Sequence, residues 1–516
     1  MRSVRMRIIA AVAVLAAVGV GGWQLLPSSG DNDKTIVVGT TDSITSLDPA
    51  GAYDSGSWAL YSNIYQSLLT YEPGGVEPVP DAAKSCGFEG GGLTTYQCEL
   101  RDDLKFPSGR KVTVKDVKYS IDRIKAINSP VGPAPLLSNL KSVDTDGDNV
   151  VFRLSSGDAT FPFKLATGVG AIVDSTKYPE NKVRTDDGAD GTGPYTLTGY
   201  TKDEKITLEP NGSYKGAFKA GKPVELRYYA DSAKLQAAWK AGEVSVATRQ
   251  LPPKMLASLS ASDTTQRVTE AESSETRNLY FNVREGSPLR DERVRRALAW
   301  LVNRQEIATS VYDGTVEPLY SLIPTGITGH STSFFDAYPQ PDVDKAKQLL
   351  KAAGVSTPVT FTYGYGKRGA AEPEAAELKR QLEAGGLFKV DVKGYEWSEF
   401  KKQWADGKLD AYAVGWVADY PDADTFAAPL VGTGSTMNTG YSSKAVDKLI
   451  LSSQQYADRS RVSTDFRRLQ DDVAQDVPVI PLWQRKEYVV ATEDVGGSQY
   501  LADGNGVFRL WSLNWI

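Results

Sequence analysis

The chain has 516 residues, with 58 Lys and Arg against 64 Asp and Glu, and a formal net charge of −6. This acidic balance argues against a nucleic-acid-binding protein, and 41% hydrophobic with 24% charged residues argues against a disordered chain. A single core seldom exceeds about 300 residues, so we expect two or more domains. The only histidine, His330, leaves no histidine-rich metal site, and we expect it in a surface loop.

The N-terminal residues 1–30 have the pattern of an export segment. Arg2, Arg5 and Arg7 precede an uncharged, mostly apolar run at 8–26, long enough as a helix to cross a bilayer core of about 30 Å. Either the run stays as a membrane anchor or it is a signal peptide cleaved near residue 30. Both alternatives export the rest of the chain, to the outer face of the cytoplasmic membrane or to the periplasm or cell surface.

The first elements after this segment follow from apolar spacing. Residues 36–40 predict a buried strand, and residues 58–69 have helical apolar spacing. A second helix is expected after Thr113, and a third is expected from Asp291, a good N-cap, to Val302. Alternation of strands with helices along the chain predicts α/β domains.

Cys86 and Cys98 are the only cysteines, and three consecutive glycines at 90–92 lie between them. These glycines predict a turn between two short strands, a hairpin that brings the two side chains within reach of a disulfide. A disulfide persists only in an oxidising compartment, which agrees with export. The alternative is two unrelated buried thiols, since two cysteines without a nearby histidine do not make a zinc site.

Two glycine-containing segments resemble ligand loops, and we interpret both as ordinary turns. Residues 364–369 match G-x-G-x-x-G, but the following helix is expected only near Pro373, and a dinucleotide fingerprint needs its third glycine inside the helix. Residues 144–148 resemble a calcium loop without its sixth-position glycine and twelfth-position glutamate, so we expect a hairpin turn.

Five segments, spread in order over the exported chain, resemble the family 5 extracellular solute-binding proteins, the peptide, nickel and oligosaccharide receptors of ABC importers. They are Leu-Asp-Pro-Ala at 47–50 with Asn-Ile-Tyr-Gln-Ser-Leu-Leu at 63–69, residues 100–117 with Val114 in place of the usual alanine, Gly-Thr-Gly-Pro-Tyr at 191–195, residues 280–298, and Gly-Trp-Val-Ala-Asp-Tyr-Pro-Asp-Ala-Asp at 415–424.

The resemblance implies an α/β fold of the large, three-domain periplasmic-binding-protein type. Two hinged lobes are built from discontinuous segments, and an additional domain is attached; chain crossings are expected near Tyr280 and near Arg485. The implied division is lobe I at 31–75, 193–279 and 488–516, the additional domain at 76–192, and lobe II at 280–487. A monomer is expected.

The resemblance also implies a ligand site. Asp419, with a pKa near 4, pairs with the ammonium group of a peptide, and the backbone of Gly415, Trp416 and Val417 extends a strand with it. Trp397, Trp58, Ser55, Trp483 and Arg485 align with positions in or beside the cleft. The alternatives are a helix N-cap role for Asp419, Asp422 or Asp424, and core packing for Trp397.

Two departures from the family pattern affect these expectations. No cysteine precedes Cys86, so we expect no lipid anchor, and the apolar run becomes the expected tether. No arginine occurs between 381 and 458, where some oligopeptide-binding relatives place the groups that meet the ligand carboxylate. Carboxylate binding is therefore left to residues elsewhere.

The resulting function is an extracytoplasmic receptor that delivers oligopeptides or dipeptides to an ABC permease, without cofactor, metal or catalysis. The second hypothesis keeps the receptor and changes the ligand to an oligosaccharide or another small organic solute, since ten tryptophans suit sugar stacking. Nickel is disfavoured by the single histidine. A secreted hydrolase is disfavoured because the chain has no G-x-S-x-G and no second histidine.

Overall fold

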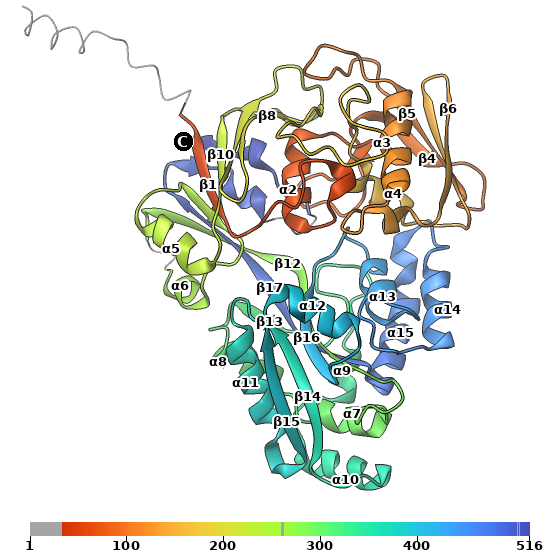
Figure 1. The fold of residues 1–516 in the computed structure, drawn as a ribbon, viewed down its shortest axis with the longest axis vertical. Coiled ribbons are helices and arrows are strands. Elements are labelled where there is room, and N and C mark those ends of the chain that lie inside the picture. The colour runs from red at the N-terminus through yellow and green to blue at the C-terminus, as the bar shows by residue number, and fades with distance from the viewer. Residues whose placement is uncertain (1–33, 260–262, 503, 505) are drawn as a thin grey trace, which may run out of the picture.

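The computed structural model describes residues 34–516 except 260–262, 503 and 505, and Figure 1 shows two bodies connected by long strands. The predicted signal or anchor at 1–30 lies outside the described residues. Within the described part of the chain, no helix is both long and apolar enough to cross a membrane.

One sheet of 11 strands passes through both bodies. In spatial order its strands are β15 (Phe388–Tyr395), β14 (Val359–Gly366), β16 (Ala411–Trp416), β12 (Gln266–Phe281), β17 (Val479–Thr492), β11 (Val246–Thr248), β1 (Ile36–Thr40), β10 (Val224–Tyr228), β9 (Lys205–Pro210) and β8 (Tyr195–Thr201), with β13 (Val316–Pro318) on β17. The predicted strand at 36–40 is confirmed as β1.

Each body contains parallel strands linked by helices, which confirms the α/β prediction. β1 is parallel to β10 and β11, and β14 is parallel to β15 and β16. The helices are α2 (Ser55–Ile64), α3 (Val114–Ile127), α4 (Phe161–Leu165), α5 (Ser232–Lys240), α6 (Pro253–Ser258), α7 (Glu292–Ala299), α8 (Arg304–Ser310), α9 (Ser333–Ala337), α10 (Val343–Ala353), α11 (Ala371–Leu382), α12 (Trp397–Ala405), α13 (Asp424–Val431), α14 (Lys444–Ser453) and α15 (Ser463–Asp476).

β12 and β17 are the strands that the two lobes share (Figure 1). The first half of β12, up to Glu272, pairs with the half of β17 that also pairs with β11. The register then shifts between Glu272 and Thr276, and the second half of β12 pairs with β16. The chain thus changes lobes at a β-bulge that contains Ser273 and Ser274. The residue boundaries predicted for the lobes remain predictions.

A separate four-stranded sheet forms the core of a further region, in the order β4 (Ala83–Phe88), β5 (Thr95–Leu100), β7 (Asn149–Leu154) and β6 (Leu140–Asp146). Cys86 and Cys98 lie opposite each other in β4 and β5, and their disulfide is formed, as predicted. The Asp-rich segment at 144–148 is the β6–β7 hairpin turn, with Gly147 at φ +59°.

Several helix boundaries differ from the predicted ones for local reasons. α2 begins at Ser55 because the Asp54 side chain accepts a hydrogen bond of 2.8 Å from Ser57 N, and it ends before Tyr65, whose backbone is extended. α3 begins after Thr113, as predicted. α11 begins at Ala371, close to the predicted Pro373, and the glycine motif at 364–369 ends β14 and continues as the loop before the helix.

The Leu-Asp-Pro-Ala motif holds the first segment of the chain to α3. Asp48 and Arg123 form a two-pronged ion pair at 2.7 and 2.5 Å, and their side chains are 1% and 2% exposed. Asp48 also accepts hydrogen bonds from the backbone N–H groups of Ala50 and Arg184, at 3.0 and 2.6 Å. The motif residue Asp48 is therefore a fold determinant, remote from any ligand role.

The glycines of Gly-Thr-Gly-Pro-Tyr allow two backbones to touch. A Cβ atom at Gly191 would lie 2.2 Å from the carbonyl oxygen of Ile64, and one at Gly193 would lie 2.6 Å from that of Asn63. Any side chain would force this segment away from the end of α2. The motif thus fixes α2, which lines the cavity described below.

We predict that the disulfide is present in the exported protein. Thiol labelling of denatured, unreduced protein should find no free thiol, and labelling after reduction should find both Cys86 and Cys98. Replacing both by serine should lower the free energy of unfolding by about 3 kcal/mol, because the open loop adds entropy to the unfolded chain. Two labelled thiols on most unreduced molecules would contradict the assignment.

We also predict that Arg123→Met lowers the free energy of unfolding by about 3–5 kcal/mol, because it leaves the Asp48 carboxylate buried without its partner. Urea titration followed by circular dichroism measures the loss. Arg153→Met is the matched control: Arg153 pairs with Asp144 at 2.9 Å with both side chains more than half exposed. The control should lose less than about 1 kcal/mol, and equal losses in the two variants would refute the argument.

Candidate ligand-binding site

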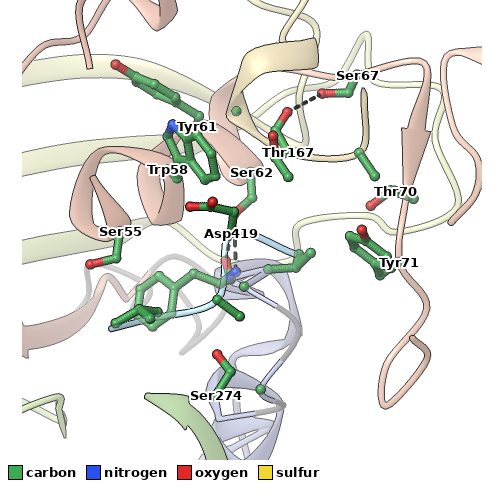
Figure 2. Close-up of a pocket in the computed structure, with 18 of the residues that line it drawn as sticks. Ser55, Trp58, Tyr61, Ser62, Ser67, Thr70, Tyr71, Thr167, Ser274 and Asp419 are labelled. Carbon is green, nitrogen blue, oxygen red and sulfur yellow. Dashed lines mark hydrogen bonds between the residues drawn. The ribbon is translucent and has the colours of Figure 1, made fainter. Parts of the chain in front are cut away.

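A cavity of about 130 Å³ lies where the two lobes meet, roughly ten times the space that one buried water needs. One side is formed by α2, by residues 67–71 and by the loop after α4. The other side is formed by Ser273 and Ser274 of the β12 bulge and by the three residues 417–419 that follow β16. Figure 2 shows Asp419 in the middle of these residues, with Trp58 and Ser62 of α2 beside it.

Asp419 is half-buried and one of its carboxylate oxygens is engaged. Its Oδ2 accepts hydrogen bonds from the Tyr53 hydroxyl at 2.7 Å and from Thr425 Oγ1 at 3.3 Å. Among the described residues, Oδ1 has no hydrogen-bond donor. Burial raises the pKa of Asp419 from its ordinary value to about 6, although the two hydroxyl donors oppose the shift. The expectation of a pKa near 4 is therefore corrected.

The Tyr53–Asp419 hydrogen bond connects the two sides of the cavity. Tyr53 precedes α2, and its ring lies 5.3 Å from the ring of Trp58. Trp58 Nε1 donates to the carbonyl of Ala52 at 3.3 Å, and a Cβ atom at Gly168 would lie only 2.5 Å from the indole. The contacts with Tyr53, Ala52 and Gly168 therefore hold Trp58 as an aromatic wall beside the carboxylate.

The N-cap residue of α13 is Ala423, so none of Asp419, Asp422 and Asp424 takes the alternative N-cap role. Asp422 Oδ1 accepts a hydrogen bond of 2.8 Å from the backbone N–H of Asp424, at the start of α13. Asp422 also forms a buried two-pronged ion pair with Arg459, with both contacts at 2.7 Å. The Asp422 carboxylate is thus bonded within the protein, whereas Asp419 lines the cavity.

The predicted site residues divide into two groups. Ser55, Trp58, Val417 and Asp419 line the cavity. Gly415 and Trp416 lie outside it at the end of β16, where they pair with Arg277 and Thr276 of β12. Trp397 begins α12 and packs on Phe400, with the guanidinium of Arg368 over its ring at 4.8 Å.

Trp483 and Arg485 are held away from the cavity by partners that are distant in sequence. Trp483 is 2% exposed, and its Nε1 donates to the buried Glu374 carboxylate at 2.7 Å. Arg485 Nε donates to Glu275 at 2.7 Å. The resemblance implies a place at the cleft for both side chains, whereas neither lines the cavity in the structure. No motif in the sequence identifies Glu374 or Glu275 as the acidic partner.

Three charged residues line the cavity that the sequence interpretation missed. Arg249 follows β11 at φ +75°, Glu487 belongs to β17, and Asp81 precedes β4. Arg249 is the only cation among the described lining residues. Burial raises the pKa of Glu487, and it raises the pKa of Asp81 to about 6. No motif surrounds any of the three, so only the fold brings them to the site.

The described residues hold no group of three or more His, Cys, Asp and Glu side chains placed to bind a metal ion. His330 lies outside the cavity lining, in an exposed loop, and its Nδ1 is 2.7 Å from the carbonyl oxygen of Ile323. The serine hydroxyls of the cavity therefore have no imidazole beside them. The arrangement is suited to binding a polar, charged ligand between two surfaces.

Comparisons with known proteins agree with this architecture. A dipeptide-binding protein of Pseudomonas aeruginosa is 26% identical over 483 residues, which cover 86% of this chain and 87% of that protein. Among solved structures, a periplasmic binding protein from Helicobacter pylori in complex with the peptide STSA aligns with a TM-score of 0.80 at 23% identity, covering 94% and 98% of the two chains. A periplasmic binding protein of A. tumefaciens R10 in complex with agropinic acid also aligns at 0.80, with 21% identity and coverage of 94% and 99%.

The family model described as bacterial extracellular solute-binding proteins, family 5, matches residues 77–438, which is more than half of the chain. The match includes four of the five segments that carry the resemblance. The chain therefore belongs to the family 5 bacterial extracellular solute-binding proteins.

Proposed function

We propose that the protein is an extracytoplasmic receptor that binds short peptides in the cavity between its lobes and delivers them to an ABC permease. The observation that carries this proposal is Asp419, a carboxylate at the meeting point of the lobes with one oxygen open toward the cavity. The names of the dipeptide-binding relative and of the STSA complex support a peptide ligand. Export through residues 1–30, with or without retention at the membrane, belongs to the same proposal.

Recognition of a peptide ammonium follows from the state of this carboxylate. A buried carboxylate without a cation is destabilised in its charged form, which is why the pKa of Asp419 is raised to about 6. A ligand ammonium at Oδ1 supplies the missing charge through a short, charge-assisted hydrogen bond. Tyr53 and Thr425 hold Oδ2, so the carboxylate does not have to reorient to meet the ligand.

Lobe closure around the ligand follows from the connection through β12 and β17. The cavity takes lining residues from both sides of the β12 bulge, so a ligand in it contacts both lobes at once. A ligand that contacts both lobes only when they are together binds the closed state more tightly than the open state. It therefore shifts the equilibrium toward the closed state. The permease can then distinguish the loaded receptor from the empty one by shape.

A non-peptide organic solute is the second candidate. The structure in complex with agropinic acid aligns as well as the peptide complex does, so this fold accommodates other ligands. Trp58 offers a ring on which a sugar or another flat ligand can stack. A hydrolase is disfavoured because the one histidine is placed away from the cavity.

We predict that Asp419→Asn weakens peptide binding by about 3 kcal/mol, roughly a hundredfold, because the ligand ammonium stays buried without a countercharge. Asparagine keeps an acceptor for the Tyr53 hydroxyl, so the variant should fold normally. Titration calorimetry with Ala-Ala and with N-acetylated Ala-Ala measures the effect.

The acetylated ligand serves as the control for this pair. Acetylation should weaken binding to the unmodified protein strongly and binding to the variant little. The variant already lacks the carboxylate that pairs with the ligand ammonium, so removing the ammonium has no further pair to break. Equal affinities of free and acetylated peptide for the unmodified protein would contradict ammonium recognition. Tight binding of a sugar without peptide binding would replace the peptide proposal by the second candidate.

Peptide affinity should also depend on pH between about 5 and 7. The ammonium binds the charged carboxylate, and below a pKa of about 6 the empty site is protonated, so affinity falls by up to tenfold per pH unit as the pH drops further. Calorimetry at several pH values should show this loss in the unmodified protein. In Asp419→Asn the dependence should shrink to the part caused by the other lining carboxylates with a raised pKa, Asp81 and Glu487, and an unchanged pH profile would count against the assignment.

A further inference from the structure

The lining of the cavity has a surplus of negative charge. Three carboxylates line it, from Asp81, Asp419 and Glu487, whereas Arg249 is the single cation among the described lining residues. A neutral zwitterionic ligand brings one positive and one negative group, and so it leaves this surplus unbalanced. The nearby cations decide whether the surplus is already compensated inside the protein.

The two cations whose charges act on Glu487, Arg249 and Arg485, each have another acidic partner. Arg249 Nε donates to Asp42 at 2.9 Å, and its Nη1 lies 3.7 Å from Glu487 Oε2. Arg485, whose charge acts on Glu487, donates to both oxygens of Glu275, at 2.7 and 3.1 Å.

On the Asp419 side the cation is Lys164. Its charge acts on Asp419, but its ammonium is bonded to the buried Asp158 at 2.7 Å. Arg249, Arg485 and Lys164 are therefore bonded to carboxylates outside the cavity lining, so they compensate the lining carboxylates only in part.

Glu487 is the most confined of the three carboxylates. The residue is 7% exposed, and its Oε1 is buried without a hydrogen-bond partner among the described residues. Leaving a buried acceptor of this kind unsatisfied costs about 1–3 kcal/mol, and more for a charged group. Burial also raises the pKa of Glu487, as expected for a carboxylate without a sufficient countercharge. Glu487 thus resembles Asp419 in having one oxygen without a hydrogen-bond donor in the described part of the protein.

We propose that the cavity selects ligands with two cationic groups: a terminal ammonium at Asp419 and a second cation, a lysine or arginine side chain of the peptide, at Glu487. This proposal rests on the proposed function, which gives Asp419 its role. It adds the chemical class of the peptide, namely one with a cationic side chain. Glu487 lies on β17, at the junction of the lobes. A ligand cation bound to Glu487 therefore adds a second charged contact to the one at Asp419.

Three dipeptides test the selection on the unmodified protein: Lys-Ala, norleucyl-Ala and Glu-Ala. Norleucine keeps the straight carbon chain of lysine and lacks its ammonium, so the comparison isolates the charge. Calorimetry should show Lys-Ala binding at least about tenfold tighter than norleucyl-Ala, as one charge-assisted hydrogen bond implies. Glu-Ala should bind weakest. Equal binding of Lys-Ala and norleucyl-Ala overturns the proposal.

Glu487→Gln tests the location of the second cation. The variant should lose the preference for Lys-Ala over norleucyl-Ala. The control is Glu270→Gln, which removes the same charge from the neighbouring strand β12 at a position outside the cavity, where Glu270 pairs with Lys486 at 2.8 Å. The control should keep the full preference. A preference retained in Glu487→Gln overturns the assignment to Glu487.

The outcomes separate this proposal from the function on which it rests. If Glu487→Gln does not fold, the Lys-Ala and norleucyl-Ala comparison on the unmodified protein still decides the selection. Binding of norleucyl-Ala that depends on a free ammonium, without any advantage of Lys-Ala, overturns only the two-cation selection. Absence of binding for all three dipeptides overturns both the selection and the peptide-receptor function.

Discussion

The pairing of β12 with β17 is the constraint on which the geometry of the whole molecule depends. These strands belong to the sheets of both lobes, and their shared register breaks at the bulge between Glu272 and Thr276. A bulge leaves a residue unpaired and bends the strand, so the sheet changes direction there without losing its continuity. Ser273 and Ser274 reach the cavity for this reason, and Glu487 of β17 lines it beside them. The binding site is thus placed by a local irregularity in the pairing of these two strands.

Sequence patterns revealed the parts of this protein whose causes are local. The strand β1, the start of α3 at Thr113, the β6–β7 hairpin and the disulfide follow from spacing and turn residues within short segments. The resemblance added the fold class and directed attention to Asp419.

Features that depend on distant partners could not be predicted in the same way. Trp483 is withdrawn from the cleft by Glu374, which is 109 residues away in sequence. Tyr53 meets Asp419 across 366 residues, and Arg249 enters the cavity without any motif around it. The raised pKa of Asp419 has the same origin, since burial is a property of the assembled lobes. Most of the cavity chemistry is therefore tertiary in origin.

The recurrent motifs and the ligand contacts are largely different residues. Asp48 closes a buried ion pair with Arg123, and Gly191 and Gly193 let two backbones touch. These residues maintain the frame. The charged groups of the cavity, apart from Asp419, come from positions outside such motifs. This separation allows the family frame to persist while the ligand specificity changes through a few unmarked side chains.

The order of strands in the large sheet also has a consequence for the way the chain is made. β17 lies between β12 and β11, at the centre of the sheet, yet it begins at Val479. A chain made only as far as residue 478 therefore has two half-sheets with open, hydrogen-bonding edges and no strand to join them. Neither half can complete its core during synthesis, so the usual domain-by-domain order of folding from the N-terminus does not apply to the lobes. Completion waits until β17 has been made, and until then both half-sheets expose strand edges that can pair with another chain.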